Sequence, residues 1–374
     1  MYVRASLHIG GKMKIQTTKE ALFNGIQIVH NVVGTKVNLP ILSNMLLETV
    51  NGKLKMITTD LDIGISCEYP VEIMESGSIT VHTKRFSDII HELPDGDVVL
   101  NVKKNNMVTI QTENCEFKIA GLPKDEFPKL PEFKDKEAIR ISQPLLKEMF
   151  IKTTFAASKD ETRYVLNGIL FEVENNKISL IATDGRRLAI IEKNINTGIN
   201  QQISMIVPVK TINELNRNLK DEGEVLIVLG ENQVLFDLGA IHIISRLIEG
   251  QFPSYKQVVP QEQKDKIKLN REKFLLVLKR AAILSTQDYQ VAKLEVFKNK
   301  LVVSKSTPDI GESREELSSE YSGKELIVGF NPAYLIDVLK NLQETVVNFE
   351  VTDPEKPGVI RADGYLYVVL PMRL

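Results

Sequence analysis

The chain repeats one sequence pattern three times, at a spacing of about 125 residues. The segment Met56–Asp60 returns as Leu180–Asp184. A second segment, which begins at Val81, has counterparts that begin at Val207 and Val328. Repetition at a fixed period is the signature of an array of similar modules. A catalytic site rarely needs three copies, so we expect function to arise from what the three modules build together.

The modules span residues 13–131, 138–260 and 267–374, and two proline-led, charged connectors separate them. Residues 1–12 have no counterpart in the repeat, and we interpret them as a flexible extension, a remnant of cloning or an upstream start. Each module divides again into two β-α-β-β-β halves, which predicts six helices in the chain. Long runs of two-residue alternation favour antiparallel sheets with helices on one face, an α+β fold.

Local signals support the same division into strands and helices. Ser142 and Asn270 stand where a helix begins, and their side chains suit the unpaired amides of a first helical turn. Phe274 and Leu278 follow helical spacing after Asn270. Asn51 and Gly52 form a pair that is typical of a tight turn between two strands.

The composition excludes several classes of protein. Hydrophobic residues make up 43% and charged residues 26% of the chain, as in soluble globular proteins. No apolar run approaches the roughly 20 residues that span a bilayer, and residues 1–10 lack the apolar core of a secretory signal. The two cysteines, Cys67 and Cys115, both fall in the first module. A disulfide framework would repeat with the modules, so we expect reduced thiols and a cytoplasmic protein without a membrane partner.

Signatures of enzymatic chemistry are sparse. The chain has no phosphate-binding loop, no dinucleotide-binding glycine motif and no CxxC pair, and its five histidines are scattered. We therefore expect no catalytic residues, no cofactor and no metal. One alternative is a metal-dependent hydrolase, because Asp60 and Asp62 lie two apart in a strand-like stretch and could share a divalent cation. The second module, however, reads Asp184-Gly185-Arg186, which is more typical of a turn.

The charge is distributed unevenly along the chain. The six predicted helices, taken as residues 17–34, 82–93, 142–158, 210–220, 270–285 and 332–341, together carry +6, whereas the whole chain carries −2, which leaves −8 for the rest. If the helices face one direction, that face is positive on an otherwise acidic protein. Lys and Arg are also good formers of exposed helices, so the pattern has a purely structural alternative.

The C-terminal residues Tyr365–Leu374 read as a strand that runs into Pro371, Met372 and Leu374. Chain ends usually fray, whereas an apolar, Met-bearing end either packs into the core or forms an adaptable binding surface. From these residues alone the core interpretation is favoured.

Four stretches resemble a known family. They are Thr183–Ala189, Arg163–Gly168, Gly329–Asn331 with Tyr334, and Val369–Leu374. Over residues 13–374 the chain resembles the bacterial DNA polymerase III beta subunits, the sliding clamps. The resemblance implies three clamp domains per chain and a head-to-tail homodimeric ring, with helices lining a central hole and antiparallel sheets outside. It also revises the C-terminal interpretation, because in this family the C-terminus borders a pocket for short partner segments.

The function implied by the resemblance is that of a non-enzymatic processivity factor. It would encircle double-stranded DNA without reading sequence, and it would tether the replicative DNA polymerase, the clamp loader and other proteins that carry a clamp-binding motif. Twelve helices at ~9–10 Å spacing give a circle roughly 35 Å across, which leaves a hole of about 25 Å for a duplex roughly 20 Å wide. A remaining alternative is a monomeric repeat scaffold that binds peptides but not DNA.

The resemblance also implies three sets of site residues. The set expected to face DNA is Lys36, Lys84, Arg85, Lys159, Arg163, Tyr164, Lys210 and Arg217. The set expected at the dimer interface is Phe117 and Ile119, from an edge strand at residues 115–119, with Ala282, Ile283 and Leu284. The set expected to form the partner-segment pocket is Leu166, Thr183, Gly185, Arg186, Arg187, Leu188, Pro253, Val258, Tyr289, Asn331, Tyr334, Val368, Val369, Leu370, Pro371, Met372, Arg373 and Leu374. The chain departs from a common family pattern at Arg186, where His is frequent, and at Leu370, where Met is frequent.

Overall fold

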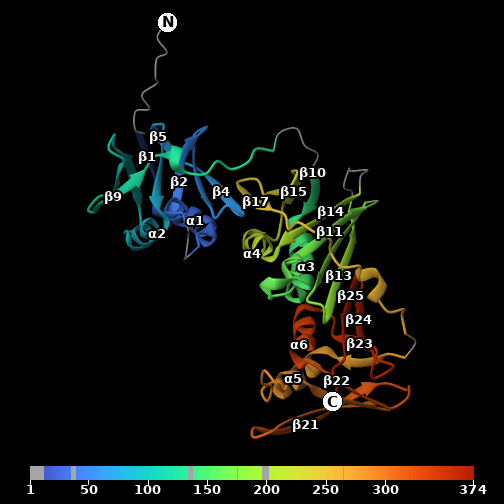
Figure 1. Ribbon diagram of the computed structural model, residues 1–374. Coiled ribbons are helices and arrows are strands. Elements are labelled where there is room, and N and C mark those ends of the chain that lie inside the picture. Colours follow the sequence, from blue (N-terminus) through green and yellow to red (C-terminus); the bar gives the residue numbers. More distant parts are fainter. Residues whose placement is uncertain (1–11, 35–38, 134–137, 175, 196–201, 264) are drawn as a thin grey trace. The chain divides into compact units, whose positions relative to one another are not determined.

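The computed structural model describes residues 12–34, 39–133, 138–174, 176–195, 202–263 and 265–374. Contacts divide the chain into two compact units (Figure 1). Unit one holds residues 1–144 and 213–247, and unit two holds residues 145–212 and 248–374. No helix in the described ranges is long and apolar enough to cross a membrane.

Unit one is built on a 13-stranded sheet that is antiparallel throughout. The strand order is β10-β15-β16-β17-β4-β3-β2-β6-β9-β8-β7-β1-β5. Its elements are β1 (Met13–Thr18), α1 (Lys19–Val29), β2 (Asn44–Val50), β3 (Lys53–Thr59), β4 (Ile63–Pro70), β5 (Glu72–Glu75), β6 (Ser78–His82), α2 (Thr83–Glu92), β7 (Asp97–Val102), β8 (Met107–Gln111), β9 (Glu116–Leu122), β10 (Ala138–Ser142), β15 (Glu224–Leu229), β16 (Gln233–Asp237) and β17 (Ile241–Arg246).

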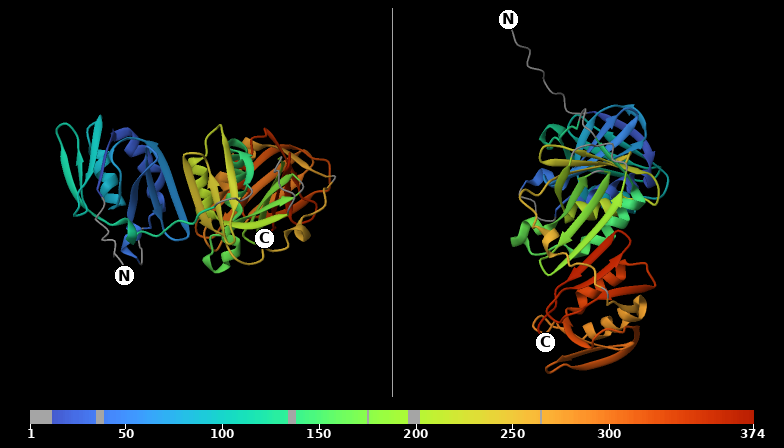
Figure 2. Two further views of the ribbon diagram at one scale, coloured as in Figure 1. Left: turned by 90° about the horizontal axis from the view of Figure 1, so that it is seen from above. Right: turned by 90° about the vertical axis from the view of Figure 1, so that its right-hand side faces the viewer.

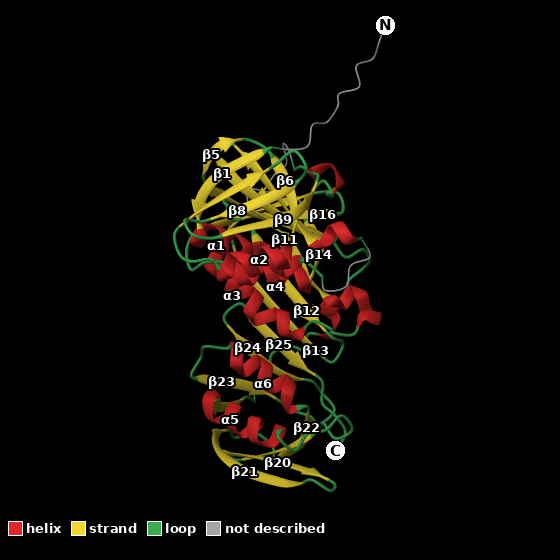
Figure 3. Ribbon diagram, turned by 90° about the vertical axis from the view of Figure 1, so that its left-hand side faces the viewer, coloured by secondary structure: helices red, strands yellow, loops and turns green. Residues whose placement is uncertain are grey.

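Unit two is built on a 12-stranded antiparallel sheet in the order β14-β11-β12-β13-β25-β24-β23-β18-β21-β20-β19-β22. Its strands are β11 (Gly168–Glu174), β12 (Lys177–Thr183), β13 (Arg187–Asn194), β14 (Ile203–Pro208), β18 (Ile267–Asn270), β19 (Ala292–Phe297), β20 (Lys300–Thr307), β21 (Gly311–Glu320), β22 (Leu326–Phe330), β23 (Val346–Glu350), β24 (Gly358–Ala362) and β25 (Tyr365–Val369). Its helices α5 (Arg271–Ala282) and α6 (Pro332–Asn341) pack against each other beside the strands (Figure 3). Two of the three boundaries between the units fall inside α3 (Gln143–Thr153) and α4 (Val209–Asn218), and the third follows β17.

The predicted β-α-β-β-β halves are confirmed. The order β10-α3-β11-β12-β13 recurs as β14-α4-β15-β16-β17, then as β18-α5-β19-β20-β21 and β22-α6-β23-β24-β25. The first module follows the same order and adds one short strand, β5, at the sheet edge. The helix predicted within residues 17–34 is shorter than expected, because α1 ends at Val29 and tightens into a 3₁₀ turn over His30–Val32.

Short-range chemistry explains where elements begin and turn. Asn270 Oδ1 accepts a hydrogen bond from Lys273 N at 3.0 Å, so the predicted cap of α5 is confirmed. Phe274 and Leu278 lie on the buried face of that helix. Asn51 and Gly52 both have positive φ, of 50° and 78°, as the tight turn between β2 and β3 requires.

The aspartate pair of the hydrolase alternative lies in a turn between β3 and β4, not in a strand. Asp60 Oδ1 accepts hydrogen bonds from the amides of Asp62 and Ile63, at 3.0 and 2.8 Å. Leu61 between them has a φ of 80°. The Asp60 carboxylate therefore shapes the turn, and the described residues contain no cluster of three or more metal-ligating side chains.

Modules join through main-chain pairing of their edge strands. In unit one, β4 pairs with β17 over Ile63–Cys67, in the register Cys67↔Ile241. In unit two, β13 pairs with β25 in the register Arg187↔Val369. These pairings use strand edges that would otherwise be open to association with other chains.

The two thiols are expected to differ sharply in reactivity. Cys67 is 1% exposed, and burial raises the pKa of its thiol to about 12. Because the thiolate is the nucleophile, only about one molecule in ten thousand is reactive at this site at pH 8. Cys115 is half-buried and free. Titration with a chromogenic disulfide at pH 8 should modify one thiol per native chain and two in denaturant; two fast equivalents in the native protein would contradict this.

Candidate functional site

The predicted pocket residues all lie in unit two, although they come from six segments of the sequence. These segments are the 3₁₀ turn Glu161–Asn167, the β12–β13 turn, the 3₁₀ turn Tyr255–Val258, the segment after α5, the start of α6 and the C-terminal residues. The C-terminal end lies at the surface of this unit (Figure 2).

Three of the predicted residues join one apolar cluster. Leu166, Leu188 and Val368 pack with Phe252 and Tyr255. Leu188 and Val368 are direct partners in the β13–β25 register. Pro253 and Val258 flank this cluster on exposed positions, and Val258 is 59% exposed. The cluster therefore offers apolar surface at its rim, which is what a buried anchor side chain requires.

The turn between β12 and β13 is held by its own side chains. Asp184 Oδ1 accepts hydrogen bonds from the amides of Arg186 and Arg187, at 2.9 and 3.1 Å. Thr183 Oγ1 donates to the carbonyl of Arg187 at 2.5 Å. Gly185 has a φ of 85°, a conformation that favours glycine. The interpretation of Asp184-Gly185-Arg186 as a turn is therefore confirmed.

Arg187 is the most heavily bonded side chain of the site. It is 8% exposed, and its guanidinium donates to Asp184 Oδ2 at 3.0 Å, Asp337 Oδ2 at 2.6 Å and the carbonyl of Phe155 at 2.5 Å. The ring of Tyr334 lies 4.5 Å from the guanidinium carbon, a cation–π contact. One side chain thus connects β13 with α6.

The charge state of Arg187 follows from these neighbours. Burial opposes the charge, but Tyr367, Asp337 and Asp184 outweigh it and raise the pKa of the guanidinium. Burial also raises the pKa of the Tyr367 hydroxyl, which donates to the carbonyl of Tyr334 at 2.8 Å. Arg187 is therefore a fixed cation, and Tyr334 is held from two sides.

Two backbone hydrogen bonds fix the C-terminal residues. The amide of Leu370 donates to the carbonyl of Arg186 at 2.9 Å, and the amide of Met372 donates to the carbonyl of Gly329 at 2.8 Å. A Cβ at position 329 would lie 2.6 Å from the carbonyl oxygen of Met372, so the close approach requires glycine. Val368 and Val369 are buried, whereas Leu370 and Leu374 are 45% and 67% exposed. The core interpretation is therefore confirmed for Val368 and Val369, whereas Leu370 and Leu374 remain accessible.

Asn331 and Tyr289 complete the group. Asn331 Oδ1 caps α6 by accepting from Ala333 N at 3.0 Å, and its amide nitrogen donates to Gln290 Oε1 at 3.1 Å. The neighbouring Tyr289 is 49% exposed. Asn331 therefore ties the start of α6 to the segment that carries Tyr289.

Sequence reasoning misses Asp337 and Phe155, which bind Arg187. Asp337 lies 150 residues from Arg187, and it reads as an ordinary exposed position of α6. Phe155 contributes only its carbonyl and ring. The local pattern around these residues contains no signal for such a contact.

The residues predicted to face DNA are all exposed where the structure describes them. Lys84 and Arg85 belong to α2, Lys210 and Arg217 to α4, and Lys159, Arg163 and Tyr164 to the segment that precedes β11. Arg217 pairs with Glu214 at 2.6 Å, and Arg163 donates to the carbonyl of Asp184 at 3.1 Å. Lys36 lies outside the described residues.

The residues predicted at the dimer interface lie at element ends and edges. Phe117 is 38% exposed and Ile283 is 78% exposed, whereas Ile119, Ala282 and Leu284 are half-buried. The predicted edge strand begins at Glu116, one residue later than expected, because Cys115 belongs to the preceding turn.

Comparison with known proteins covers nearly the whole chain. Family models of the DNA polymerase III beta subunit match residues 13–131 (N-terminal domain), 140–254 (central domain) and 256–373 (C-terminal domain). The beta sliding clamp of Pseudomonas aeruginosa is 32% identical over 368 residues, which cover 97% of this chain and 100% of that protein.

Solved structures agree with this match. The DNA polymerase sliding clamp from Bacillus subtilis superposes with a TM-score of 0.93 at 30% identity, covering 97% of this chain and 100% of that one. The sliding clamp from Bartonella birtlesii, solved bound to griselimycin, superposes with a TM-score of 0.91 at 33% identity, with the same coverage.

Six related β-α-β-β-β halves in three modules define the fold of a DNA clamp. The chain belongs to the bacterial DNA polymerase III beta subunit family, the beta sliding clamps.

Proposed function

We propose that the chain is a non-catalytic processivity factor that closes as a homodimeric ring around duplex DNA. The ring tethers the replicative polymerase, the clamp loader and other proteins that carry a clamp-binding segment. The observation that carries this proposal is the match of three clamp domains across residues 13–373, together with family members of nearly equal length. Retention by topology needs no tight or sequence-specific contact with the DNA.

Exposed cations support the DNA-facing assignment. Lys84, Arg85, Lys159, Arg163 and Lys210 are all exposed, and Tyr164 is 59% exposed. Such side chains contact phosphates without reading bases, so a ring lined by them holds the duplex and still slides. The assignment also includes Arg217, whose pairing with Glu214 reduces its contribution.

Two open strand edges support the dimer assignment. Among the described strands, Glu116–Ile119 of β9 pair only with β8, and Gly311–Ser318 of β21 pair only with β20. We propose that β9 of one copy pairs with β21 of the second, while Phe117 meets the exposed Ile283 and its neighbours. Such a contact uses different surfaces on the two copies. It closes into a ring when the rotation that relates one copy to the next permits closure.

The pocket assignment rests on the site in unit two. Leu188 of the apolar cluster follows the fixed Arg187 on β13, and the C-terminal residues are bonded to the carbonyls of Arg186 and Gly329. We propose that partner segments anchor apolar side chains here and bond to the exposed main chain. Griselimycin, bound in the structure of the Bartonella birtlesii clamp, provides a chemical probe.

Retention on circular DNA tests the ring. The chain is first sized by light scattering, then loaded by its clamp loader onto a nicked circle and filtered through a sizing matrix. We expect dimer-sized protein to elute with the circle and to be lost after the circle is cut once. Retention that survives linearisation would contradict topological binding, and a monomer without retention would favour the peptide-binding scaffold.

Replacement of Asp60 and Asp62 by asparagine tests the hydrolase alternative. We expect the double variant to be retained on the circle like the wild type, and we expect no hydrolytic activity to be lost.

A further inference from the structure

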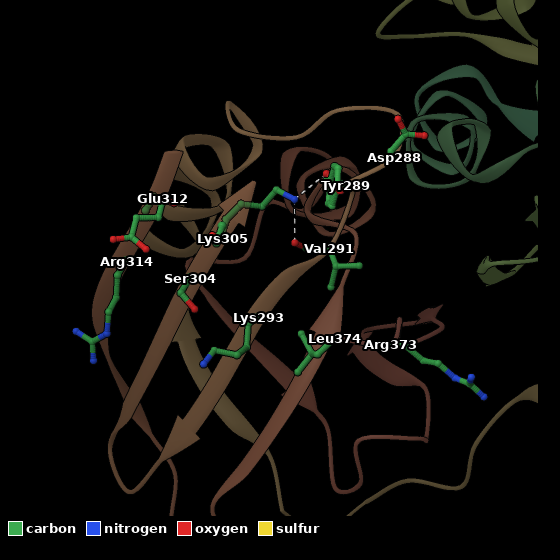
Figure 4. Close-up of a pocket in the computed structure, with 12 residues that line it drawn as sticks. Asp288, Tyr289, Val291, Lys293, Ser304, Lys305, Glu312, Arg314, Arg373 and Leu374 are labelled. Carbon is green, nitrogen blue, oxygen red and sulfur yellow. Dashed lines mark hydrogen bonds between the residues drawn. The ribbon is translucent and has the colours of Figure 1, made fainter. Parts of the chain in front are cut away.

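Lys305 is a charged side chain buried in unit two. It is 3% exposed, and its ammonium donates to the carbonyls of Tyr289 and Val291, at 2.7 and 2.9 Å (Figure 4). Among the described residues, no salt bridge to Lys305 is found, and no neighbouring charge affects its pKa. Burial alone lowers the pKa of this amine. A buried cation without a counter-charge is unfavourable unless it makes hydrogen bonds that require it, so these two bonds explain its place.

The two carbonyls belong to the segment between α5 and β19, residues 283–291, which contains no helix or strand. Its own bonds are few and of moderate length. The amide of Thr286 donates to the carbonyl of Tyr289 at 3.2 Å, and the amide of Tyr289 donates to Thr286 Oγ1 at 3.2 Å. The segment therefore depends on side chains from outside for its conformation.

Strand β20 supplies two of those side chains from one face. Lys305 and Thr307 are two residues apart and are both 3% exposed. Thr307 Oγ1 donates to the carbonyl of Leu284 at 2.6 Å, near the start of the segment. Lys305 binds the end that carries Tyr289, so the two anchors act at opposite ends.

Tyr289 borders a cavity of about 730 Å³, which Val291, Lys305, Arg373 and Leu374 also line (Figure 4). Space on that side leaves the main chain of residues 289–291 room to shift if its anchor is removed. Figure 4 shows the Lys305 side chain reaching along the cavity to this main chain.

We propose that Lys305 is a positioning residue for the partner-segment pocket. Its ammonium fixes the main chain at Tyr289 and Val291 and so presents the Tyr289 ring to the partner segment in one orientation. The inference rests on the proposed function, because it assumes that Tyr289 belongs to the pocket. Its energetic basis is preorganisation: an anchored segment loses less freedom when a partner binds.

Griselimycin binding to the full-length chain, measured by isothermal titration calorimetry, tests the proposal. Lys305→Met keeps the length of the side chain and removes the ammonium, and we expect the Kd for griselimycin to rise about tenfold. Amide exchange at residues 289–291 should quicken at the same time. Thr307→Val is the matched control, because it removes a buried bond from the same strand to the same segment; we expect it to leave the Kd within about twofold.

A double-mutant cycle separates positioning from general destabilisation. Tyr289→Ala should itself weaken binding, and Lys305→Met should add nothing in that background. Lys305→Arg, which can still donate to both carbonyls, should restore most of the affinity. If Lys305→Met does not fold, Lys305→Gln replaces it in the test. We expect the same rise in Kd, because the glutamine amide has a shorter reach than the lysine ammonium.

The outcomes distinguish this inference from the pocket assignment. If griselimycin does not bind the wild-type chain, or binds equally well after removal of Met372–Leu374, the pocket assignment is wrong. If that removal abolishes binding while Lys305→Met or Tyr289→Ala binds like the wild type, the pocket stands and the role of Lys305 is overturned. Equal losses from Lys305→Met and Thr307→Val would also overturn it, because they would indicate a structural role only.

Discussion

A chain that lacks Met372–Leu374 should remain a dimer and lose at least about a hundredfold in affinity for a partner segment. The deletion removes the hydrogen bond from Met372 N to the carbonyl of Gly329, and it removes the apolar side chains of Met372 and Leu374, which line a hollow beside Gly329. It leaves the β13–β25 pairing intact, because that register ends at Val369. Fluorescence anisotropy with a labelled peptide from the polymerase tail measures the affinity, and light scattering measures the mass.

Met74→Ser is the matched control for this deletion. Met74 is an exposed methionine, 47% accessible, on β5 of unit one, so we expect its replacement to leave the affinity unchanged. Unaltered binding by the shortened chain would contradict the pocket assignment. Loss of the dimer would instead place the C-terminal residues in the subunit interface.

Replacement of Arg187 by methionine should give the largest loss of stability of any single change in the site. The substitution leaves the carboxylates of Asp184 and Asp337 and the carbonyl of Phe155 without their common donor. Removal of one partner of a fully buried pair costs about 3–5 kcal/mol. Asp337 is partly exposed, so we expect about 2–4 kcal/mol and a fall in Tm of about 5–10 °C.

Arg186→Met provides the control for this prediction, since Arg186 is the exposed neighbour on the same turn; its Tm should change by about 1 °C or less. Differential scanning fluorimetry measures both variants. The double variant Arg187→Met with Asp337→Asn should lose less than the sum of the two single changes, because the pair acts as one unit. Strict additivity would mean that the contact between β13 and α6 contributes little.

The repeating halves were predictable because their signals are local. The cap at Asn270 and the turn at Asn51 and Gly52 each depend on residues within a few positions along the chain. The aspartate pair shows the limit of such signals. Asp60 and Asp62 have the two-residue spacing of a strand, but the Asp60 side chain bonds to the amides that follow it and makes a turn.

The contacts that build the site could not be predicted from local pattern. Arg187 reads as a surface charge, and its burial depends on Asp337, which is distant in sequence. Lys305 lies in a polar run between Ser304 and Ser306, where a lysine would be expected in solvent, yet it is buried. Contacts with residues outside the local pattern decide both cases. The resemblance named the residues expected in the pocket, but it did not supply the side chains that hold them in place.

The difference in reactivity between the two thiols also allows one reporter group to be attached at a single site. With Cys67 inert, a maleimide dye at moderate pH should attach at Cys115 alone, without any engineered cysteine. Cys115 directly precedes β9, the strand whose outer edge we assign to subunit contact. A fluorophore there would brighten or dim as that edge is covered, so the opening and closing of single rings could be followed in the native sequence.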